Sequence, residues 1–285
     1  MLPDTMTKPD EASNVLIETP DFAEFKARMY NKTGIDLNLY KQPQMHRRLM
    51  GMVERVGKKN FLEYYTYLEQ NTGEYAALMD RITINVSELF RNPEKWKELR
   101  EKIMPASIDQ NRCMNIWSAG CSYGAEPYSL AITMDQAAPS KPYKLIASDL
   151  DRSILKRAQE GRFTQADVKH IDKQLLDKYF DYTYVKGALP DLDACYQVKD
   201  YIRGKAQFQQ HNLLADKFEH GFDLICCRNV VIYFTEPAKE ALYSRFHQAL
   251  RPGGVLFVGG AERILNYQKL GFDMPIPFFY RRKLE

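Results

Sequence analysis

The fold is decided by residues 114–131, which read Met114-Asn115-Ile116-Trp117-Ser118-Ala119-Gly120-Cys121-Ser122-Tyr123-Gly124-Ala125-Glu126-Pro127-Tyr128-Ser129-Leu130-Ala131. A strand-like run ends at Trp117, a turn of small residues follows, and a helix starts near Pro127, since proline suits a first helical turn. Strand, glycine turn and helix in this order place a ligand at the carboxyl end of the sheet in α/β folds. The stretch therefore predicts an α/β fold and makes this turn a candidate cofactor site.

The glycine spacing of the turn narrows the class of cofactor. It reads Gly120-x-x-x-Gly124, whereas dinucleotide folds have G-x-G-x-x-G, and no Lys-Ser or Lys-Thr pair follows it as in a P-loop. A nucleotide-like cofactor without phosphate remains, and Glu126 at the helix start suits a cationic group such as the α-amino nitrogen of S-adenosylmethionine. An ordinary tight turn with a solvated glutamate fits equally well, and this stretch alone does not choose between the two.

Length and composition are those of a globular protein of one or two domains. The chain has 285 residues, 45% hydrophobic and 27% charged, which is ample material for a core. No apolar run approaches the roughly 20 residues that a membrane helix needs. Residues 1–19 lack a signal-peptide pattern and are predicted to form a polar N-terminal arm. The five cysteines show no metal-ligand spacing, so we expect no metal site and a cytoplasmic protein.

One segment is strongly basic. The chain carries a formal charge of +3, yet residues 41–60 hold six Lys and Arg against Glu54 alone. We predict a helix over 43–56 and, at about 100° per residue, place its basic side chains in one arc. The residues of this basic surface are Arg47, Arg48, Arg55, Lys58 and Lys59. Charges of one sign favour docking of an acidic partner over a merely solvated face. Nucleic acid is less favoured because no aromatic side chains are interleaved.

Helical patterns fill residues 20–97, which we predict to form a helical N-terminal domain. Asp21 is expected to cap the first helix, and further helices are expected at 60–70 and from about 74. A helix over 96–103 and a loop around Pro105 fall at the predicted linker, 98–112. The polar segment 83–93 is either a capped connection or a ligand site that supplies Asn85, Ser87 and Arg91.

Strands and helices alternate from residue 113 to 285, which indicates a parallel sheet with helices on both faces. We predict strands at 143–149, 206–211, 222–227, 255–258 and 278–281, the last closing the sheet. Asp149 stands at a strand end, where a carboxylate can accept both ribose hydroxyls, while Asp151 competes to cap the next helix. Asn212 and Leu213 suit an adenine edge, and Arg228-Asn229 reaches the same rim.

Residues 165–204 interrupt this alternation and are predicted to form a small inserted subdomain. We expect a helix over 167–180 and short strands at 182–185 and 195–198. Insertions of this kind often carry partner recognition.

Five motifs together resemble the CheR family, the chemoreceptor glutamate methyltransferases. They are TINVSELFRN (83–92), WSAGCSYGAEPYS (117–129), ASDLD (147–151), NLL (212–214) and CRNVVIYF (227–234), in the family's order and spacing. The likeness covers about residues 22–282, and Met45-His46-Arg47-Arg48-Leu49 is similar to the Bacillus-type members. Three positions depart from the pattern: Ser87 replaces a frequent Thr, Ala125 replaces a frequent Glu, and Gly259-Gly260-Ala261-Glu262 replaces Gly-x-Ser/Thr-Glu.

The resemblance implies an all-helical N-terminal domain followed by a Rossmann-like S-adenosylmethionine methyltransferase domain, 113–285, with an inserted β-subdomain. The cofactor-binding residues that it implies are Asn85, Ser87, Arg91, Glu126, Asp149, Asn212, Leu213, Arg228 and Asn229. It also implies that the inserted β-subdomain of some members grips a receptor tether peptide.

The implied reaction is direct transfer of a methyl group to a receptor glutamate, with S-adenosylhomocysteine as the product. A carboxylate is ionised at neutral pH, so no general base is needed. We assign Arg91 to positioning the acceptor and the cofactor, Tyr233 to packing near the methyl group, and the basic surface to the receptor's methylation helix. The alternatives are a nucleic-acid methyltransferase and a regulatory S-adenosylmethionine-binding module; the glycine spacing disfavours a nicotinamide dehydrogenase. We expect a monomer.

Overall fold

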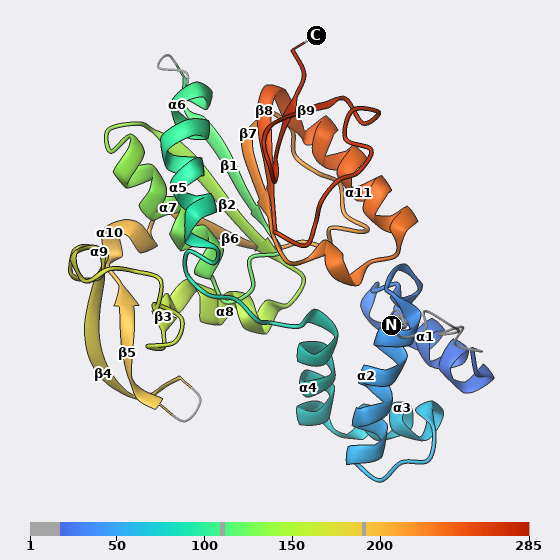
Figure 1. Cartoon of the computed structure of the whole chain (residues 1–285). Coiled ribbons are helices and arrows are strands. Elements are labelled where there is room, and N and C mark those ends of the chain that lie inside the picture. The colour runs from blue at the N-terminus through green and yellow to red at the C-terminus, as the bar shows by residue number, and fades with distance from the viewer. Residues whose placement is uncertain (1–17, 109–111, 190–191, 285) are drawn as a thin grey trace, which may run out of the picture. The chain divides into compact units, whose positions relative to one another are not determined.

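The computed structural model describes residues 18–108, 112–189 and 192–284 (Figure 1). The chain divides into two compact units, Met1–Ile82 and Thr83–Glu285. The predicted polar arm lies, except for its last two residues, outside the described residues.

The first unit is helical. Its described helices are α1 (Pro20–Thr33), the 3-10 turn η1 (Leu37–Leu39), α2 (Gln42–Arg55), α3 (Phe61–Gln70) and α4 (Thr72–Thr83). Phe61 lies between two aromatic residues of α1, with ring centroids 4.6 Å from Phe22 and 5.4 Å from Phe25. These rings are fully buried, so the predicted apolar faces of α1 and α3 form one core.

The expected cap of α1 is wrong. Thr19 occupies the N-cap without a side-chain hydrogen bond, and Asp21 lies inside the first turn. Its Oδ2 instead accepts a hydrogen bond of 3.1 Å from the backbone N–H of Phe61. Asp21 therefore satisfies an open N–H at the start of α3, a partner 40 residues away.

The basic surface is not one helical arc. Helix α2 ends at Arg55, and Gly57 has φ +70°. Gly57 N–H donates to the Glu54 carbonyl at 2.9 Å and Lys58 N–H to the Val53 carbonyl at 3.0 Å, the pattern of a Schellman motif. Lys58 and Lys59 thus follow the helix end, which corrects their predicted place.

The second unit is an α/β domain with an insertion. Its main elements are α5 (Pro93–Glu98), the π-helical turn η2 (Leu99–Ile103), α6 (Met104–Ser107), β1 (Met114–Ala119), α7 (Ala125–Ala137), β2 (Tyr143–Asp149), α8 (Arg152–Glu160), β6 (Ala206–Gln210), β7 (Phe222–Cys227), the 3-10 turn η3 (Val231–Tyr233), α11 (Glu236–Ala249), β8 (Leu250–Val258), β9 (Phe272–Ile276) and β10 (Phe279–Arg282). The predicted strands at β2 and β7 are confirmed residue for residue.

Within the described residues, these strands form one seven-stranded sheet in the order β6-β2-β1-β7-β8-β10-β9. The first five pair in parallel, and β10 runs antiparallel to both β8 and β9. The predicted α/β class with a Rossmann-like sheet is confirmed. The last strand does not close the sheet as expected, because β10 lies inside and β9, which the sequence pattern did not predict, forms the edge.

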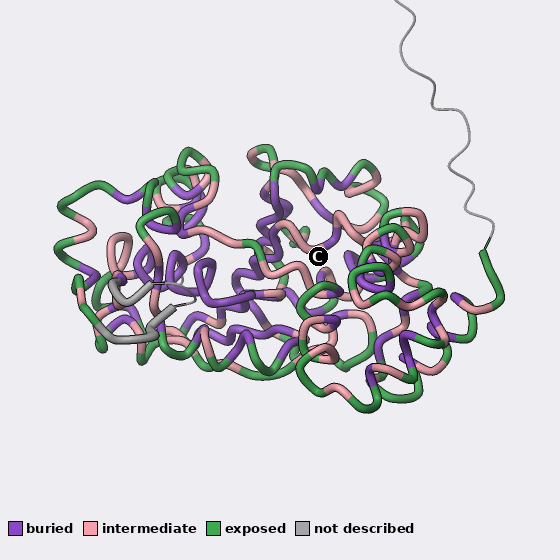
Figure 2. The backbone as a smooth tube through the Cα atoms, turned by 90° about the horizontal axis from the view of Figure 1, so that it is seen from below, coloured by how far each residue is buried: buried purple, intermediate pink, exposed green. Residues whose placement is uncertain are grey.

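Successive residues of β1 point to opposite faces of the sheet. Ile116 belongs to the core shared with α5 and α7, while the Trp117 ring lies 5.6 Å from the Phe246 ring of α11. Figure 1 shows α5 and α7 on one side of the sheet and α11 on the other. Both faces are covered, so the central strands are buried (Figure 2) and read as apolar runs.

The predicted linker is part of this domain's core. Trp96, Leu99 and Ile103 are buried in the same cluster as Ile116, and the Trp96 and Phe257 rings meet edge to face at 5.5 Å. The helix also does not end before Pro105: it continues through η2 and α6 to Ser107.

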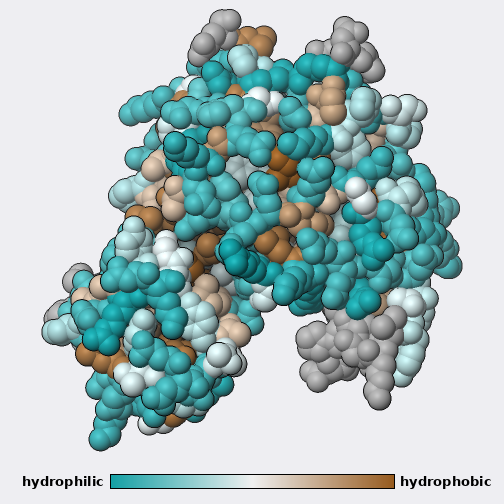
Figure 3. Space-filling model, turned by 180° about the vertical axis from the view of Figure 1, so that it is seen from behind, coloured by the Kyte–Doolittle hydropathy of each residue, from teal (hydrophilic) through white to brown (hydrophobic). Residues whose placement is uncertain are grey.

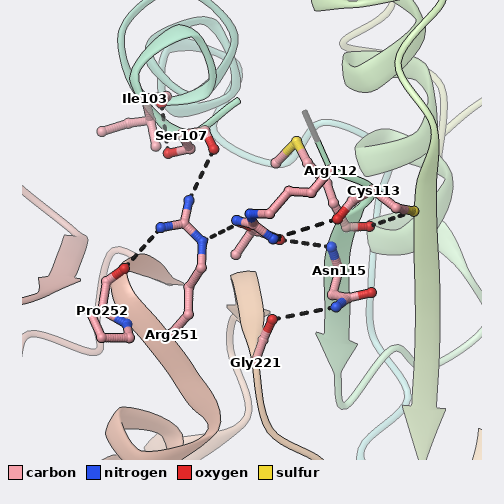
Figure 4. Close-up of polar contacts among 10 residues, drawn as sticks. Ile103, Ser107, Arg112, Cys113, Asn115, Gly221, Arg251 and Pro252 are labelled. Carbon is pink, nitrogen blue, oxygen red and sulfur yellow. Dashed lines mark hydrogen bonds and ion pairs between the residues drawn. The ribbon is translucent and has the colours of Figure 1, made fainter. Parts of the chain in front are cut away.

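Asp223, at the start of β7, joins three parts of the domain at the amino ends of the strands. Its fully buried carboxylate accepts from Asn115 N–H at 2.8 Å, from the Arg112 guanidinium and from Arg251 Nε at 2.5 Å. Arg251 also donates to the Ser107 carbonyl at 3.1 Å (Figure 4). This cluster ties β1, β7, β8 and α6 together at the edge opposite the predicted cofactor turn.

The insertion carries β3 (Arg162–Phe163), α9 (Lys173–Tyr179), β4 (Phe180–Leu189), β5 (Leu192–Val198) and α10 (Asp200–Arg203). Its described strands form a separate sheet in the order β3-β5-β4, as the predicted β-subdomain requires. Helix α9 is shorter than expected, because Asp172 caps it by accepting from Leu175 N–H at 2.9 Å.

Figure 3 shows one face of the molecule, which is mostly hydrophilic and carries several hydrophobic areas near its middle. Among the described residues, no helix has both the length and the hydropathy required to cross a membrane.

Candidate functional site

The sheet order reverses at β1, which lies between β2 and β7. The carboxyl ends of such strands form the crevice where open α/β sheets bind ligands. Asp149 ends β2, Arg228 directly follows β7, and Glu126 lies in the first turn of α7, after the turn that follows β1. The fold therefore brings these predicted residues to one edge, called here the cofactor edge.

The turn after β1 is folded tightly over the end of β2. Gly120 and Cys121 both donate their N–H to the Ser148 carbonyl, at 2.8 and 2.9 Å. Gly120 has φ +83°, and a Cβ there would lie 2.5 Å from Val230 Cγ2. Only glycine suits both the left-handed backbone and this close approach, so the glycine turn holds β1 against the loop after β7.

Glu126 lies in the first turn of α7 and is buried, with 8% of its surface exposed. Its Oε1 accepts a hydrogen bond of 2.8 Å from Ser118 Oγ. Burial raises the pKa of Glu126 to about 7, although the positive charge of Arg228 opposes the rise. A cation bound beside this buried carboxylate would stabilise its ionised form.

Two roles were considered for Asp149 and Asp151: ribose binding and capping of the following helix. Asp151 caps α8 by accepting from Ser153 N–H at 2.8 Å and Ile154 N–H at 3.3 Å. Asp149 is left at the cofactor edge, where burial raises its pKa. Its oxygens accept from Ser122 N–H at 2.8 Å and Asp151 N–H at 3.1 Å, which leaves lone pairs for further hydroxyl donors.

Asn85 connects the segment 83–92 to this edge. Its amide nitrogen lies 3.2 Å from Asp151 Oδ2, and its amide oxygen accepts from Ser122 Oγ at 3.3 Å. The Ser87 carbonyl accepts from the Tyr123 hydroxyl. Asn85 and Ser87 therefore lie beside the turn that follows β1. This placement agrees with the interpretation of segment 83–93 as part of a ligand site.

The backbone carbonyl of Arg91 is a hydrogen-bond acceptor for the side chain of Arg228. Arg228 Nη2 donates to the Arg91 carbonyl at 2.7 Å and to Asn92 Oδ1 at 2.9 Å. The Arg228 guanidinium lies over the rings of Trp96 and Phe257, 5.4 and 4.7 Å from their centroids. Its buried Nε has no hydrogen-bond partner among the described residues. The Arg91 side chain is 36% exposed, with Nε 3.9 Å from Glu88 Oε1.

Asn212 and Leu213 follow β6, and the backbone N–H of His211 donates to the Asp149 carbonyl at 2.9 Å. Asn212 Oδ1 accepts from Leu214 N–H at 2.9 Å. Leu213 is buried, and its carbonyl accepts from Arg245 Nη1 at 2.6 Å. Tyr233 is half-buried in η3, after the Arg228 loop. Asn212 and Leu213 thus lie at the carboxyl end of β6, and Tyr233 lies in the turn η3 that follows the carboxyl end of β7.

Glu262 is a site-forming residue that sequence reasoning missed. Its carboxylate accepts four backbone N–H groups, three of them from Asn229, Val230 and Val231. Asn229 itself has φ +62°. The signal in the sequence is the acidic residue of the motif Gly259-Gly260-Ala261-Glu262, which departs from the family's pattern.

The basic surface belongs to the helical unit. Arg47 is exposed, while Arg48 Nη1 donates to the Arg81 carbonyl at 3.5 Å. Arg55 Nη2 donates to both oxygens of Glu74, at 2.6 and 2.7 Å. The charge of Arg55 is therefore balanced within the unit, which weakens its predicted part in the basic surface.

Two family models match the two units. "CheR methyltransferase, SAM binding domain" matches residues 85–275, and "CheR methyltransferase, all-alpha domain" matches residues 20–83. The chain belongs to the CheR methyltransferase family. It is thus an S-adenosylmethionine-dependent methyltransferase.

CheR relatives cover nearly the whole chain. A "Chemotaxis protein methyltransferase" of Listeria innocua serovar 6a is 37% identical over 261 residues, which is 91% of this chain and 96% of that protein. The protein of the same name from Listeria monocytogenes has the same identity and coverage. That of Borreliella burgdorferi is 31% identical, over 93% of this chain and 95% of its own length.

The CheR cofactor has groups that match the chemistry of this edge. Glu126 suits its ammonium group, Asp149 its ribose hydroxyls, and the unpartnered N–H of buried Arg228 its carboxylate. As cofactor contacts, all nine residues stay predictions: Asn85, Ser87, Arg91, Glu126, Asp149, Asn212, Leu213, Arg228 and Asn229. The residues present therefore fit S-adenosylmethionine.

Proposed function

We propose that this methyltransferase acts on glutamate side-chain carboxylates of chemotaxis receptors and converts them to glutamyl methyl esters. The observation that carries the proposal is that both units, over about nine-tenths of the chain, match relatives named chemotaxis protein methyltransferase. Such receptors adjust their sensitivity when their methylation changes. We further propose that the protein works in the cytoplasm and as a monomer.

The residues assigned to the site suit a carboxylate acceptor. Bound S-adenosylmethionine supplies an electrophilic methyl group on a sulfonium centre, and an ionised carboxylate attacks it without a general base. The assigned residues include no histidine, in keeping with that chemistry. What the chain must supply is alignment of the two reactants and exclusion of water.

Arg91 is the residue we assign to the acceptor. Its backbone is held by Arg228 at 2.7 Å, while its guanidinium remains partly exposed. A fixed backbone with a reachable guanidinium can orient an incoming carboxylate with paired hydrogen bonds. Tyr233, in the loop that continues from Arg228, is assigned to packing beside the transferred methyl group.

The helical unit is assigned to receptor capture. Within the basic surface, the described ion pairs of 4.0 Å or less include none of Arg47, Lys58 and Lys59. An acidic methylation helix would be attracted to them, and the attraction would weaken as salt rises. Arg55 contributes less, because Glu74 neutralises it.

The experiment is methyl transfer from methyl-labelled S-adenosylmethionine to receptor-containing membranes, scored as methanol released by mild base. Base-labile methanol from wild-type protein is expected, because glutamyl methyl esters hydrolyse under these conditions. Arg91→Ala should lose most of this signal. Arg28→Ala is the matched control, because Arg28 is an exposed arginine paired with Glu24. No released methanol from any chemoreceptor, with product binding intact, would overturn the proposal in favour of a regulatory module. Base-stable label in nucleic acid would instead favour a nucleic-acid methyltransferase.

A further inference from the structure

We infer that Glu262 is a positioning residue for the cofactor edge: its carboxylate holds the loop from Arg228 to Val231 in shape. The inference rests on the proposed cofactor site, because it gives that loop a role in binding. Glu262 follows β8, outside the assigned site residues.

The carboxylate of Glu262 is enclosed by backbone N–H groups. Oε2 accepts from Asn229 and from Gly259, both at 2.7 Å, and Oε1 accepts from Val230 at 2.8 Å and Val231 at 2.9 Å. Only 3% of the residue is exposed. A buried anion with four charge-assisted bonds is a strong and specific arrangement, and its oxygens face the backbone, so its part is to position the loop.

Three consecutive N–H groups pointing at one acceptor require an unusual backbone. Asn229 has φ +62°, a left-handed conformation that asparagine adopts more readily than most residues other than glycine. Without the carboxylate, the N–H groups of Asn229, Val230 and Val231 would be left without their acceptor. Glu262 thus satisfies three consecutive backbone donors and holds the loop in this shape.

Gly259 makes this approach possible. A Cβ at Gly259 would lie 2.5 Å from Glu262 Oε2 and 3.0 Å from the Asn229 nitrogen, which is closer than real contacts allow. The motif Gly259-Gly260-Ala261-Glu262 therefore functions as one unit, with the glycine admitting the carboxylate.

The loop held by Glu262 touches the site on two sides. Arg228, its first residue, donates to the Arg91 carbonyl. Val230 lies against the β1 turn, where a Cβ on Gly120 would come within 2.5 Å of its Cγ2. Any loosening of the loop should therefore reach both the segment of Arg91 and the glycine turn.

The test is Glu262→Gln, which keeps the shape but replaces one acceptor oxygen with an NH₂ donor that faces backbone donors. In the free protein, we expect faster amide hydrogen exchange at residues 229–231. We also expect S-adenosylhomocysteine to bind roughly tenfold or more weakly, since small misplacements in a site cost this much. Glu240→Gln is the matched control, because Glu240 on α11 makes one exposed contact, with Asn266 at 2.9 Å.

Glu262→Asp, which keeps the charge on a shorter side chain, should restore part of the affinity, and it replaces Glu262→Gln if that variant does not fold. Folded variants with unchanged exchange at 229–231, or with product affinity within twofold of wild type, would overturn the inference. Neither readout uses a receptor. A failure of the proposed function would instead appear as wild-type protein that binds the product and methylates no receptor.

Discussion

Lys169 and Glu88 form an ion pair, with Nζ 2.6 Å from Oε2, and it joins the insertion to the segment that carries Arg91. The other oxygen of Glu88 lies 3.6 Å from His170 Nε2 and 3.9 Å from Arg91 Nε. Leu89 N–H also donates to the Asp167 carbonyl at 3.0 Å. The insertion is therefore attached to the same segment as the proposed acceptor-binding arginine.

Lys169→Ala should lower kcat/KM for methyl transfer severalfold, because the Arg91 segment loses one of its attachments. The free energy of unfolding should change by less than about 1 kcal/mol, as expected for an exposed ion pair. Steady-state kinetics and urea denaturation measure the two effects. Lys173→Ala, which breaks the Lys173–Asp177 pair on the same subdomain, should leave kinetics unchanged. Equal kinetics for both variants would remove the insertion from this role.

Glu126→Gln should weaken S-adenosylhomocysteine binding by about 10- to 100-fold, because the complex loses one buried charge-assisted hydrogen bond. Because the pKa of free Glu126 is raised to about 7, wild-type binding near neutral pH should release protons as the ligand's ammonium favours the carboxylate. Calorimetry in buffers of different ionisation enthalpy measures that release. Binding with no proton release in wild type would contradict the assigned partner.

The same residue predicts a pH effect on stability. The pKa of Glu126 is raised from an ordinary value of 4.5, so the folded state binds the extra proton between pH 4.5 and about 7. Its contribution to the free energy of unfolding is therefore present at low pH and lost as pH rises through that range. The Glu126→Gln variant should be more stable than wild type at pH 8. Its free energy of unfolding, measured by urea denaturation at several pH values, should vary less with pH.

Gly120→Ala should destabilise the domain or abolish cofactor binding, since its Cβ would overlap Val230 and its φ is +83°. Adding Val230→Ala should recover only part of the loss, because the backbone strain remains. Gly51→Ala is the opposite case: Gly51 is exposed within α2 and nothing lies within 4 Å of the new Cβ. It should stabilise the helical unit by about 0.5–1 kcal/mol. Thermal denaturation and product binding measure both variants.

Asp223→Asn should destabilise the protein by about 1.5–3 kcal/mol, because the partly buried guanidinium groups of Arg112 and Arg251 lose their counter-charge. Burial alone would raise the pKa of Asp223, but the bonds from Arg112, Asn115 and Arg251 hold it below its ordinary value. The stability it provides is thus present at neutral pH and lost as pH falls below about 4. Denaturation across pH measures this effect.

The control for that cluster is Asp273→Asn, an exposed carboxylate 3.8 Å from Arg281, which should cost less than about 1 kcal/mol. Folded Asp223→Asn at low temperature should keep wild-type affinity for S-adenosylhomocysteine, because Asp223 lies at the amino end of β7. A large loss of affinity would show that the two ends of the sheet are coupled.

Charge reversal on the helical unit tests the receptor-docking role. Arg47→Glu with Lys59→Glu should lower receptor methylation at least about tenfold at low salt, while product affinity stays unchanged. These positions are chosen over Arg55, because breaking its pair with Glu74 would disturb the fold. If the double variant methylates receptors as well as wild type does, and salt affects neither protein, the basic surface has no role in receptor docking.

Most regular elements of both units could be predicted from the sequence, although β9 could not. Apolar residues at helical spacing located α2 and α3, and largely apolar runs located β2 and β7, because each pattern reports burial along one short segment. The motifs placed Asp149 and Arg228 at strand ends and Glu126 at the start of the helix after β1. A parallel sheet then brings those ends together without further information.

Contacts between distant residues could not be predicted in this way. Asp21 was expected to cap its own helix, but it serves α3, and Glu74 removes the charge of Arg55 from across the unit. Glu262 holds a loop more than 30 residues before it. The pairing of β10 with both β8 and β9 is a further case.

The chain's own sequence thus determined the class of fold, the family and the residues that reach the cofactor edge, because local periodicity and closely spaced motifs are sufficient for these. Only the tertiary structure decided which partner each charged or polar side chain has. The physical reason is that a buried carboxylate binds whichever donors the fold brings near it, and in this protein those donors are often tens of residues away.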